Sequence, residues 1–378
     1  MAVLVVNAGS SSVKVAAFAP DLTQIAAARV TEIGGAARLE GAGGAAPIAA
    51  PDYTAAMAAV LAELDRAGVA LSRVTVAAHR VVHGGPDLAA PCLLTPDTLA
   101  RIDAAVPLAP LHNPPALLAI RALAALVPDL PQTASFDTAF HATMPDVARR
   151  YALPERAEAL GIRRYGFHGI SYAALVARLP ALTGAPLPAR LLAFHMGNGV
   201  SACAIREGRS VATTMGYSPL DGLTMGTRAG GIDGNAVLRL AEEFGIDGAR
   251  QILNRESGLL GLGGASDMRA LHAAGTERSR FAVGHFIYWA TRHAGSLIAA
   301  MGGLDAVAFT GGIGENDPVV RAGIVDGLSF TGAALDPVAN AAHATRLHAP
   351  RSDVAIWTVP AAEEAQIARD ALALLAGG

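Results

Sequence analysis

Lysine is almost absent from this 378-residue chain: Lys14 is the sole example among 29 basic residues, and all the others are arginines. Cysteine is equally rare. Cys92 and Cys203 are too few for a disulfide framework or a cysteine-rich metal site, and they fit a reducing compartment. No apolar run is long enough to predict a membrane span, and no basic leader precedes the first strand, so we expect a cytoplasmic protein. The net charge of −3 gives no reason to expect a nucleic-acid partner.

The chain opens with a pattern that predicts a β-hairpin. Residues 3–6 are apolar, residues 13–18 are apolar except for Lys14, and the polar turn between them carries an amide, a glycine and three serines. Together with Lys14, this turn gathers N–H donors, hydroxyls and one ammonium, which suits a bound phosphate. The alternative is a hairpin edge with a lysine lying along apolar surface. No Walker A pattern occurs, so the turn is not a P-loop.

A second stretch repeats this pattern. Residues 191–205 again read as strand, glycine-rich polar turn and strand, and aligning His195 with Asn7 places Gly197 on Gly9. The offset of 188 residues is close to half of the chain, which indicates an internal duplication of an α/β domain. A third glycine-rich turn is predicted at 310–316, and it fails the G-x-G-x-x-G pattern of Rossmann folds.

Charged side chains are predicted at the ends of strands. Arg80 follows an expected strand at 74–78, Asp137 follows one at 132–136, and Glu363 precedes a terminal helix expected at 365–375. Ligands of α/β sheets bind at such strand ends. The alternatives are that Asp137 caps the next turn and that Glu363 is an ordinary acid at a helix start.

Other segments carry weaker predictions. Glycines flank His168, and Arg228 lies in the glycine-rich stretch 215–233, so we expect both regions to lie against a ligand. Residues 34–44 are expected to loop out. A helix capped by Asp52 should end at Gly68, another should open near Ala116 after a proline-rich segment, and the helix at 280–301 should be a buried domain helix or a subunit contact.

These parts together fit Mg·ATP phosphoryl transfer, and their motifs resemble one family. The motifs NAGSSSVK, HRVVHGG, APLHNPP, FDTAFH, YGFHG, HMGNG, MGTR, GGIGEN and a late EE pair resemble those of the acetate and propionate kinases, in the same order from residue 3 to about residue 366. The resemblance implies an α/β fold of two duplicated ribonuclease-H-like or actin-like ATPase domains with a cleft between them. It implies an N-terminal domain at 1–139, completed by the helix 364–378, and a C-terminal nucleotide-binding domain at 140–363.

The resemblance also implies an activity and partners. The expected reaction is reversible phosphoryl transfer from ATP to acetate, or to propionate, giving acetyl phosphate and ADP, with Mg²⁺ or alternatively Mn²⁺. A homodimer is implied as well.

Roles carry over by motif position. Catalytic roles fall on Asp137, His168 and Arg228; Arg80 binds the acid's carboxylate, and Val82, Leu111 and Pro219 line its alkyl pocket. Asn7 and Glu363 are associated with magnesium. The nucleotide contacts implied are Lys14, His195, Met196, Gly197, Asn198, Gly199, Asp267, Met268, Arg269, Gly312, Ile313, Gly314, Glu315 and Asn316.

The sequence departs from the family's pattern at two places, and it is compatible with two alternatives. Met268 stands where the family usually has an aromatic residue, and Gly230–Gly231 where an acid is common. One alternative is a relative that prefers a longer acid, because one methylene changes discrimination by only about 1–3 kcal/mol. The other is a nucleotide-switching interaction protein on the same fold, which nucleotide-dependent assembly without turnover would indicate.

Overall fold

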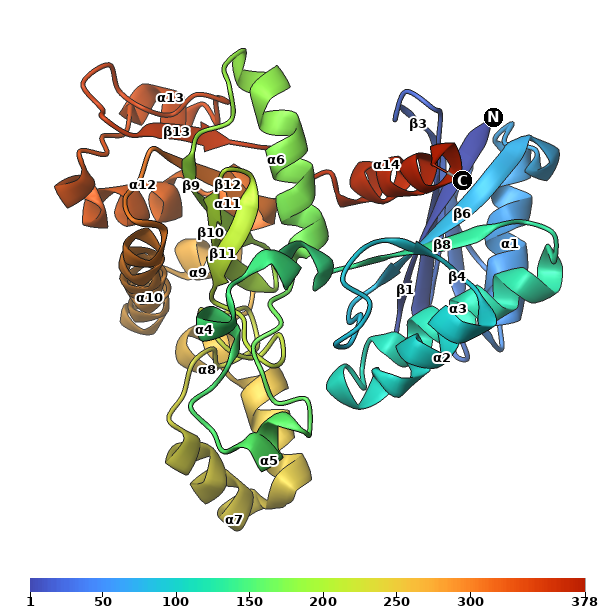
Figure 1. Ribbon diagram of the computed structural model, residues 1–378, viewed down its shortest axis with the longest axis horizontal. Coiled ribbons are helices and arrows are strands. Elements are labelled where there is room, and N and C mark those ends of the chain that lie inside the picture. The colour runs from blue at the N-terminus through green and yellow to red at the C-terminus, as the bar shows by residue number, and fades with distance from the viewer. Residues whose placement is uncertain (378) are drawn as a thin grey trace. The chain divides into compact units, whose positions relative to one another are not determined.

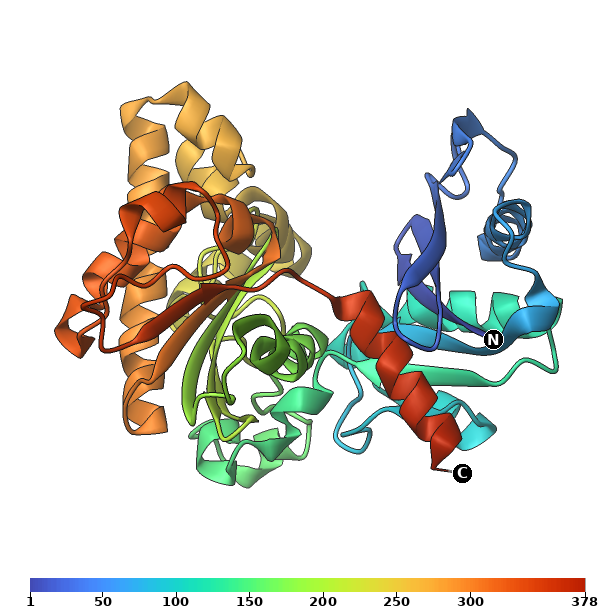
Figure 2. The ribbon, with the colours of Figure 1, turned by 90° about the horizontal axis from the view of Figure 1, so that it is seen from above.

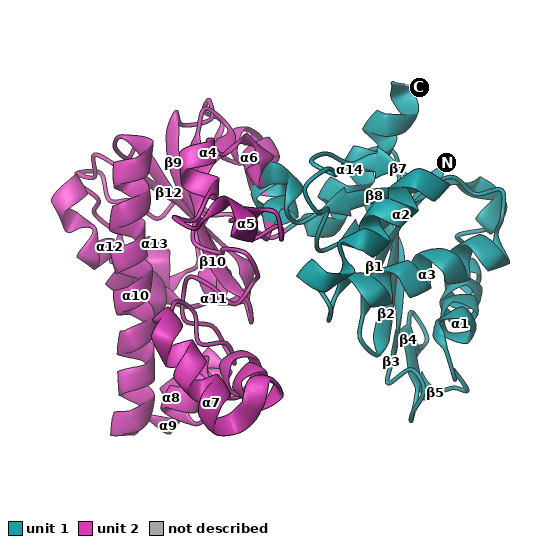
Figure 3. Cartoon of the chain, turned by 60° about the horizontal axis from the view of Figure 1, so that its bottom comes forward, with its two compact units in different colours: residues 1–140, 169–174, 362–378 teal, residues 141–168, 175–361 magenta. Residues whose placement is uncertain are grey.

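The computed structural model describes residues 1–377, which divide into two compact units (Figure 3). Unit 1 comprises Met1–Phe140, Gly169–Ala174 and the C-terminal residues from Ala362. Unit 2 comprises His141–His168 and Leu175–Ala361. The chain therefore passes between the units four times, and the first turns of one helix belong to unit 1 while the rest of that helix belongs to unit 2.

Unit 1 is built on an eight-stranded sheet in the order β5-β4-β3-β2-β1-β6-β8-β7 (Figure 1). The strands are β1 (Ala2–Gly9), β2 (Ser12–Phe18), β3 (Gln24–Thr31), β4 (Arg38–Gly41), β5 (Gly44–Pro47), β6 (Val74–Val81), β7 (Cys92–Leu93) and β8 (Gln132–Phe136). Strands β1, β6 and β8 run parallel, so their carboxyl ends meet at one edge. The other neighbours pair antiparallel.

Helices cover both faces of this sheet because side chains alternate along its central strands. Leu4 and Val6 pack on one side with α1 (Tyr53–Arg66) and α3 (Asn113–Leu126). Val3 and Val5 pack on the other side with the terminal helix α14 (Glu363–Ala376), which Figure 2 shows in red against the sheet. The short α2 (Pro96–Ala104) packs with α3 near the carboxyl edge.

Unit 2 contains a five-stranded sheet in the order β11-β10-β9-β12-β13. Its strands are β9 (Arg190–Met196), β10 (Val200–Arg206), β11 (Arg209–Thr213), β12 (Ala306–Thr310) and β13 (Ala355–Thr358). Its helices are α4 (Asp146–Arg149), α5 (Glu155–Glu158), α7 (Gly234–Gln251), α8 (Gly258–Gly263), α9 (Met268–Ala274), α10 (Glu277–Met301), α11 (Gly311–Asn316), α12 (Pro318–Gly327) and α13 (Pro337–Ala341), with α6 (Gly169–Thr183) shared between the units.

The two sheets share one topology, which confirms the predicted duplication. In unit 1 an antiparallel meander β3-β2-β1 is followed by parallel β6 and β8, and in unit 2 the meander β11-β10-β9 is followed by parallel β12 and β13. The unit 2 hairpin is one residue shorter, because Asn7 pairs with Lys14 whereas His195 pairs with Ser201.

Several local predictions are corrected by the structure. Residues 34–44 do not simply loop out, since β4 and part of β5 form there. The proline-rich segment opens α3 at Asn113, three residues earlier than expected, because Pro114 and Pro115 suit the first turn of a helix. The third glycine-rich turn is the short helix α11. The Asp52 cap is confirmed, as its carboxylate accepts a bond from Ala55 N at 2.9 Å.

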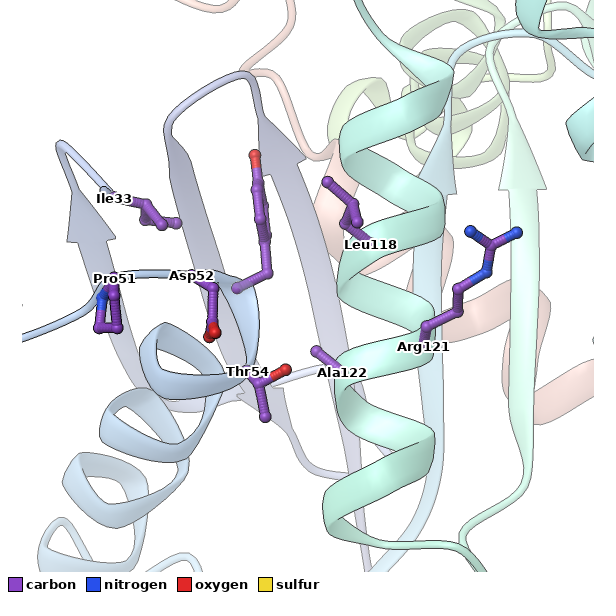
Figure 4. Close-up of a pocket in the computed structure, with 8 residues that line it drawn as sticks. Ile33, Pro51, Asp52, Thr54, Leu118, Arg121 and Ala122 are labelled. Carbon is purple, nitrogen blue, oxygen red and sulfur yellow. The ribbon is translucent and has the colours of Figure 1, made fainter. Parts of the chain in front are cut away.

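A hollow of about 440 Å³ lies on unit 1 between the start of α1 and α3 (Figure 4). It is lined by Ile33, Pro51, Asp52, Tyr53, Thr54, Leu118, Arg121 and Ala122, none of which carries a predicted chemical role. One lining residue supports the first hairpin, because the Tyr53 hydroxyl donates to the Gly9 carbonyl. Within residues 1–377, every helix is too short or too polar to cross a membrane.

Candidate active site

The carboxyl edge of the unit 1 sheet gathers three of the predicted residues. Asn7 lies near the end of β1, one position beyond the registered pair Val6 and His79. Arg80 therefore stands beside it on β6, and Asp137 follows β8, with its backbone N–H bonded to Val81 O at 3.1 Å. The parallel pairing explains why side chains 130 residues apart in the chain, at positions 7 and 137, share this edge.

Arg80 is held between two carboxylates. Its Nε and Nη2 donate to the two oxygens of Asp137 at 3.0 and 2.7 Å, and its Nη1 lies 3.7 Å from Glu363 Oε2. The Asp137 side chain is 3% exposed. Burial alone would lower the pKa of Arg80, but the charges of Asp137 and Glu363 outweigh it and raise that pKa further above its ordinary value. The guanidinium is thus permanently charged and fixed in orientation.

This edge carries oxygen donors of the kind that Mg²⁺ prefers. The amide oxygen of Asn7 and the carboxylates of Asp137 and Glu363 are hard ligands, and one arginine does not neutralise two carboxylates. The donor set therefore fits a hydrated Mg²⁺. Among residues 1–377 there is no cluster of three His, Cys, Asp or Glu side chains placed to enclose a metal.

Lys14 makes an ion pair that the sequence did not predict. Its Nζ lies 2.6 Å from Glu364 Oε1, and the two side chains are 46% and 23% exposed. Glu363 and Glu364 therefore each face a cation, Arg80 and Lys14 respectively, from the first turn of α14. An acidic first turn also complements the positive end of the helix dipole.

The predicted walls of the acid pocket belong to different units. Val82 is half-buried in the loop after β6, and Leu111, which precedes α3, is 54% exposed. Pro219 belongs to unit 2, where its carbonyl accepts a bond from Arg228 Nη1 at 2.7 Å.

In unit 2, His168 and Arg228 converge on the turn of the second hairpin. A Cβ added to Gly199 would lie 3.1 Å from His168 Nε2 and 3.2 Å from Arg228 Nη2. The His168 ring stacks on His195 with centroids 4.1 Å apart, and its Nδ1 lies 2.9 Å from the Ser201 hydroxyl. Burial lowers the pKa of Arg228 from its ordinary value.

His168 also has a left-handed backbone, with φ of 59° at the residue before α6. This conformation is uncommon outside glycine and is concentrated at functional sites. The flanking glycines serve a purpose that we did not predict. A Cβ on Gly169 would lie 2.3 Å from the Asp137 carbonyl, and one on Gly166 would lie 2.6 Å from the His141 ring. At those contacts the protein's own atoms take the space of a side chain, so packing alone requires glycine there, and the approach of a ligand to this loop stays a prediction.

The glycine-rich stretch 215–233 is likewise packed against protein. Met215, Leu223 and Met225 are buried, and a Cβ on Gly226 would lie 2.3 Å from Asn198 Oδ1. Its glycines therefore permit close backbone packing, and the expectation that the whole loop lies against a ligand is too broad. Arg228 is the part of the loop that reaches the His168 cluster.

A pocket of about 400 Å³ in unit 2 brings together parts of all three predicted nucleotide segments. Its lining residues are Gly197, Asn198, Ser266, Asp267, Met268, Arg269, Gly312, Ile313, Asn316 and Asp317. Asp267 caps α9 and pairs with Arg269 at 2.8 Å, and the hydrogen bond from Arg269 lowers the pKa of Asp267 to about 2. Met196, Gly199, Gly314 and Glu315 do not line the pocket but are next to residues that do.

Sequence reasoning missed residues that shape this pocket. Asp317 lines it, caps α12 and lies 2.8 Å from His272 Nε2. Arg321 is fully buried and donates to the carbonyls of Gly314 and Glu315 at 2.9 and 2.7 Å, which fixes α11. The D-P start signal of α12 could have indicated Asp317 as a cap, whereas nothing in the sequence pattern marks Arg321.

Comparison with known proteins defines first the class and then the family. A crystal structure of Porphyromonas gingivalis acetate kinase matches with a TM-score of 0.93 and 35% identity over 99% of both chains. A crystal structure of a propionate kinase from Francisella tularensis matches with a TM-score of 0.92 and 33% identity over 98% of both. With the duplicated sheets, these matches confirm the predicted fold of two actin-like ATPase domains.

The family follows from the sequence comparison. The model of the acetokinase family matches residues 2–369, and this chain belongs to that family. An acetate kinase of Nitrobacter hamburgensis is 43% identical over 99% of this chain and 96% of its own length. An acetate kinase of Deinococcus radiodurans is 42% identical over 99% and 98%.

Proposed function

We propose that this chain is a kinase that transfers the γ-phosphoryl group of ATP reversibly to the carboxylate of acetate, giving acetyl phosphate and ADP. Family membership over almost the whole chain supports the reaction. The residue roles rest on two arrangements with different chemistry. Unit 1 holds a fixed arginine between carboxylates, and unit 2 holds a histidine and an arginine that converge on a glycine turn. We infer that unit 1 is the N-terminal domain and unit 2 the nucleotide-binding domain.

Acetate is already ionised at neutral pH, so the reaction needs no general base. It needs the acid held in line and charge neutralised on the transferring group. Asp137 occupies the Nε–Nη2 fork of Arg80, so the acid would bind the remaining Nη1–Nη2 edge. Asp137 then orients the guanidinium rather than taking a proton. Val82 and Leu111 are proposed to wall the methyl group within unit 1, and the same role for Pro219 rests on its motif position.

His168 and Arg228 are proposed to bind the equatorial oxygens of the transferring phosphoryl group. The stack on His195 and the contact with Ser201 hold the His168 ring, and the Pro219 carbonyl holds Arg228. Donors fixed in this way need no reorganisation when charge develops, and each is typically worth roughly 3–4 kcal/mol in the transition state.

Bound Mg²⁺, or Mn²⁺ in its place, would neutralise phosphate charge and orient the phosphate oxygens. We propose that Asn7, Asp137 and Glu363 hold it through water, as their oxygen chemistry fits. Lys14 is proposed to contact the nucleotide phosphates from the first hairpin. The nucleotide contacts are proposed at His195, Met196, Gly197, Asn198 and Gly199, at Asp267, Met268 and Arg269, and at Gly312, Ile313, Gly314, Glu315 and Asn316.

We also infer a homodimer and a cytoplasmic location. The outer face of α10 exposes Phe281 and Tyr288, at 60% and 62%, so these aromatics are not buried as a buried domain helix would require. A face of this kind suits a subunit contact, which sedimentation of the purified protein would test. Cys92 and Cys203 are both free thiols, in keeping with a reducing compartment that cell fractionation would check.

A hydroxylamine trap tests the proposed function. Purified protein with Mg·ATP and acetate should form acetyl hydroxamate, and Arg80→Ala should lower kcat/KM for acetate by at least about a hundredfold. Arg190→Ala is the matched control, because Arg190 also binds an aspartate through two nitrogens, Asp305 at 3.1 and 2.5 Å, but lies outside both halves of the site.

A second substitution of Arg80 distinguishes a loss of catalysis from a loss of folded protein. Arg80→Lys keeps a charge beside Asp137 and guards against unfolding of the alanine variant, since unpairing a buried carboxylate is destabilising. Wild-type protein that binds ATP but forms no hydroxamate with any short acid would contradict the proposal. Equal losses in the Arg80 and Arg190 variants would contradict the role of Arg80.

A further inference from the structure

We propose that Asn113 is a positioning residue that fixes the size of the acid pocket and so sets the preference for acetate over longer acids. The inference rests on the proposed function and on Val82 and Leu111 as pocket walls. Asn113 itself is fully buried at the first position of α3. It acts through the backbone that carries the walls, and no catalytic role is assigned to it.

The Asn113 amide clamps the loop that carries Val82. Its Oδ1 accepts a bond from His83 N at 3.1 Å, and its Nδ2 donates to His83 O at 2.9 Å. Both backbone groups of one residue are therefore satisfied by a single side chain, as they would be by a paired strand. Because His83 directly follows Val82, this pair of bonds fixes where Val82 stands.

Asn113 also ends the turn that carries Leu111. The backbone N–H groups of His112 and Asn113 both donate to Ala109 O at 3.0 Å, which closes the turn around Leu111. The two pocket walls of unit 1 are thus tied to one residue, Val82 through its side chain and Leu111 through its backbone. Loss of the amide would separate the two walls without touching Arg80.

The neighbouring chain offers no substitute for the amide. Pro114 and Pro115 occupy the next two positions of α3 and have no N–H to donate. The loop is also tightly placed: a Cβ on Gly84 would lie 2.2 Å from Leu88 O, and Gly84 N donates to the Thr138 hydroxyl at 3.2 Å. Thr138 is the second anchor of the same loop, so it provides an independent way to loosen it.

The experiment measures acid selectivity in Asn113→Ala, Asn113→Asp and Thr138→Val. The readout is the ratio of kcat/KM for acetate to kcat/KM for propionate, measured by hydroxamate formation on one preparation. The fraction of folded enzyme cancels from this ratio, so a loss of folded protein alone does not change it. One methylene typically changes discrimination about 10- to 200-fold, and we expect the ratio to fall about tenfold in Asn113→Ala.

Two further variants loosen the same loop. Asn113→Asp keeps the volume and an acceptor for His83 N but sets a carboxylate against His83 O, so it should also lower the ratio. Thr138→Val keeps the shape and removes the acceptor for Gly84 N, and it should also shift the ratio toward propionate. These variants decide the proposal if Asn113→Ala does not fold.

Asn340→Ala is the matched control. Asn340 is a buried asparagine of unit 2 that accepts from Arg321 Nε at 2.7 Å and donates to Pro318 O at 2.8 Å. It should lower stability but leave the acid ratio unchanged. An unchanged ratio in both Asn113→Asp and Thr138→Val would overturn the inference while the proposed function stands. A wild-type protein that phosphorylates no acid would overturn both.

Discussion

The two hairpins that open the duplicated sheets have the same topology and opposite chemistry. In unit 1 the residue opposite Asn7 is Lys14, and its ammonium reaches Glu364. In unit 2 the residue opposite His195 is Ser201, and its hydroxyl reaches the His168 ring. The first hairpin therefore belongs to a network of full charges, and the second to a network of imidazoles and hydroxyls.

The next strand of each sheet extends the contrast. Beyond the pair Val6–His79, β6 brings Arg80 to the edge, held by Asp137 and Glu363. In unit 2 the corresponding residue is Thr310, the partner of His195 and the last residue of β12, and Gly311 directly after it starts α11, where a Cβ would lie 2.9 Å from the Met196 carbonyl oxygen. One copy of the fold thus has an arginine at this position, while the other has a threonine that is followed directly by α11.

The proposed roles divide one reaction between the two copies of a duplicated scaffold. A charged edge with oxygen ligands suits a small carboxylate and a divalent cation. A glycine-lined pocket with one arginine suits a nucleotide, whose own phosphates bring the negative charge. Substitutions of Arg80 and of Arg228 should therefore alter different kinetic constants, whereas Lys14 is the residue of unit 1 that is proposed to contact the nucleotide.

The largest effect is expected in unit 2, from Arg228→Ala. If Arg228 binds the transferring phosphoryl group, kcat should fall by about 10²–10³, while the KM for acetate changes little. Arg278→Ala is the matched control, because Arg278 also donates to backbone carbonyls, those of Leu262 and Gly261, at an exposed place. A large rise in the KM for acetate with kcat preserved would place Arg228 with the acid and break the division between the units.

A second prediction concerns stability at low pH, which should decrease in both units. His79 in unit 1 and His141 in unit 2 are both buried, and burial lowers the pKa of each from 6.5 to about 4. Between those values the unfolded chain binds a proton that the folded chain does not. The free energy of unfolding should therefore be highest above pH 6.5 and fall as pH drops toward 4, by roughly 3 kcal/mol for each histidine.

The units can be followed separately in this experiment. Trp289 and Trp357, the two tryptophans of the chain, both belong to unit 2, so fluorescence reports that unit while circular dichroism reports both. His141→Gln should flatten the pH dependence of the fluorescence transition in urea, and His79→Gln should flatten that of circular dichroism. An unchanged slope in both variants would show that these histidines are not the source.

The sequence was sufficient for the parts of the molecule that rest on local pattern. The hairpins, the strand at 132–136 and the Asp52 cap all follow from residue periodicity and turn chemistry, and the offset between Asn7 and His195 indicated the duplicated fold. Motif order was enough to identify the family. These features depend on neighbours in the chain, which a sequence displays directly.

Features that depend on distant neighbours could not be predicted. The need for glycine at 169 comes from the Asp137 carbonyl, and nothing in the local pattern distinguishes it from a glycine that faces a ligand. The buried Arg321 looks like any other arginine until the carbonyls of α11 surround it. The clamp by Asn113 likewise appears only when residues 83 and 113 meet.

The smallest expected effect is that of replacing Lys14, which is present in the first hairpin only. The experiment distinguishes binding of a nucleotide phosphate by Lys14 from a purely structural ion pair with Glu364. The pair with Glu364 is half-exposed, so Lys14→Met and Glu364→Gln should each change the free energy of unfolding by less than about 1 kcal/mol. Their effects on nucleotide binding should differ in sign. Lys14→Met should raise the KM for ATP about tenfold if the ammonium binds phosphate, because one charged contact is lost. Glu364→Gln releases the same ammonium and should lower that KM or leave it unchanged. Equal increases in both variants would mean that the ion pair itself shapes the hairpin, and the role of Lys14 would then be to hold the start of α14 in place.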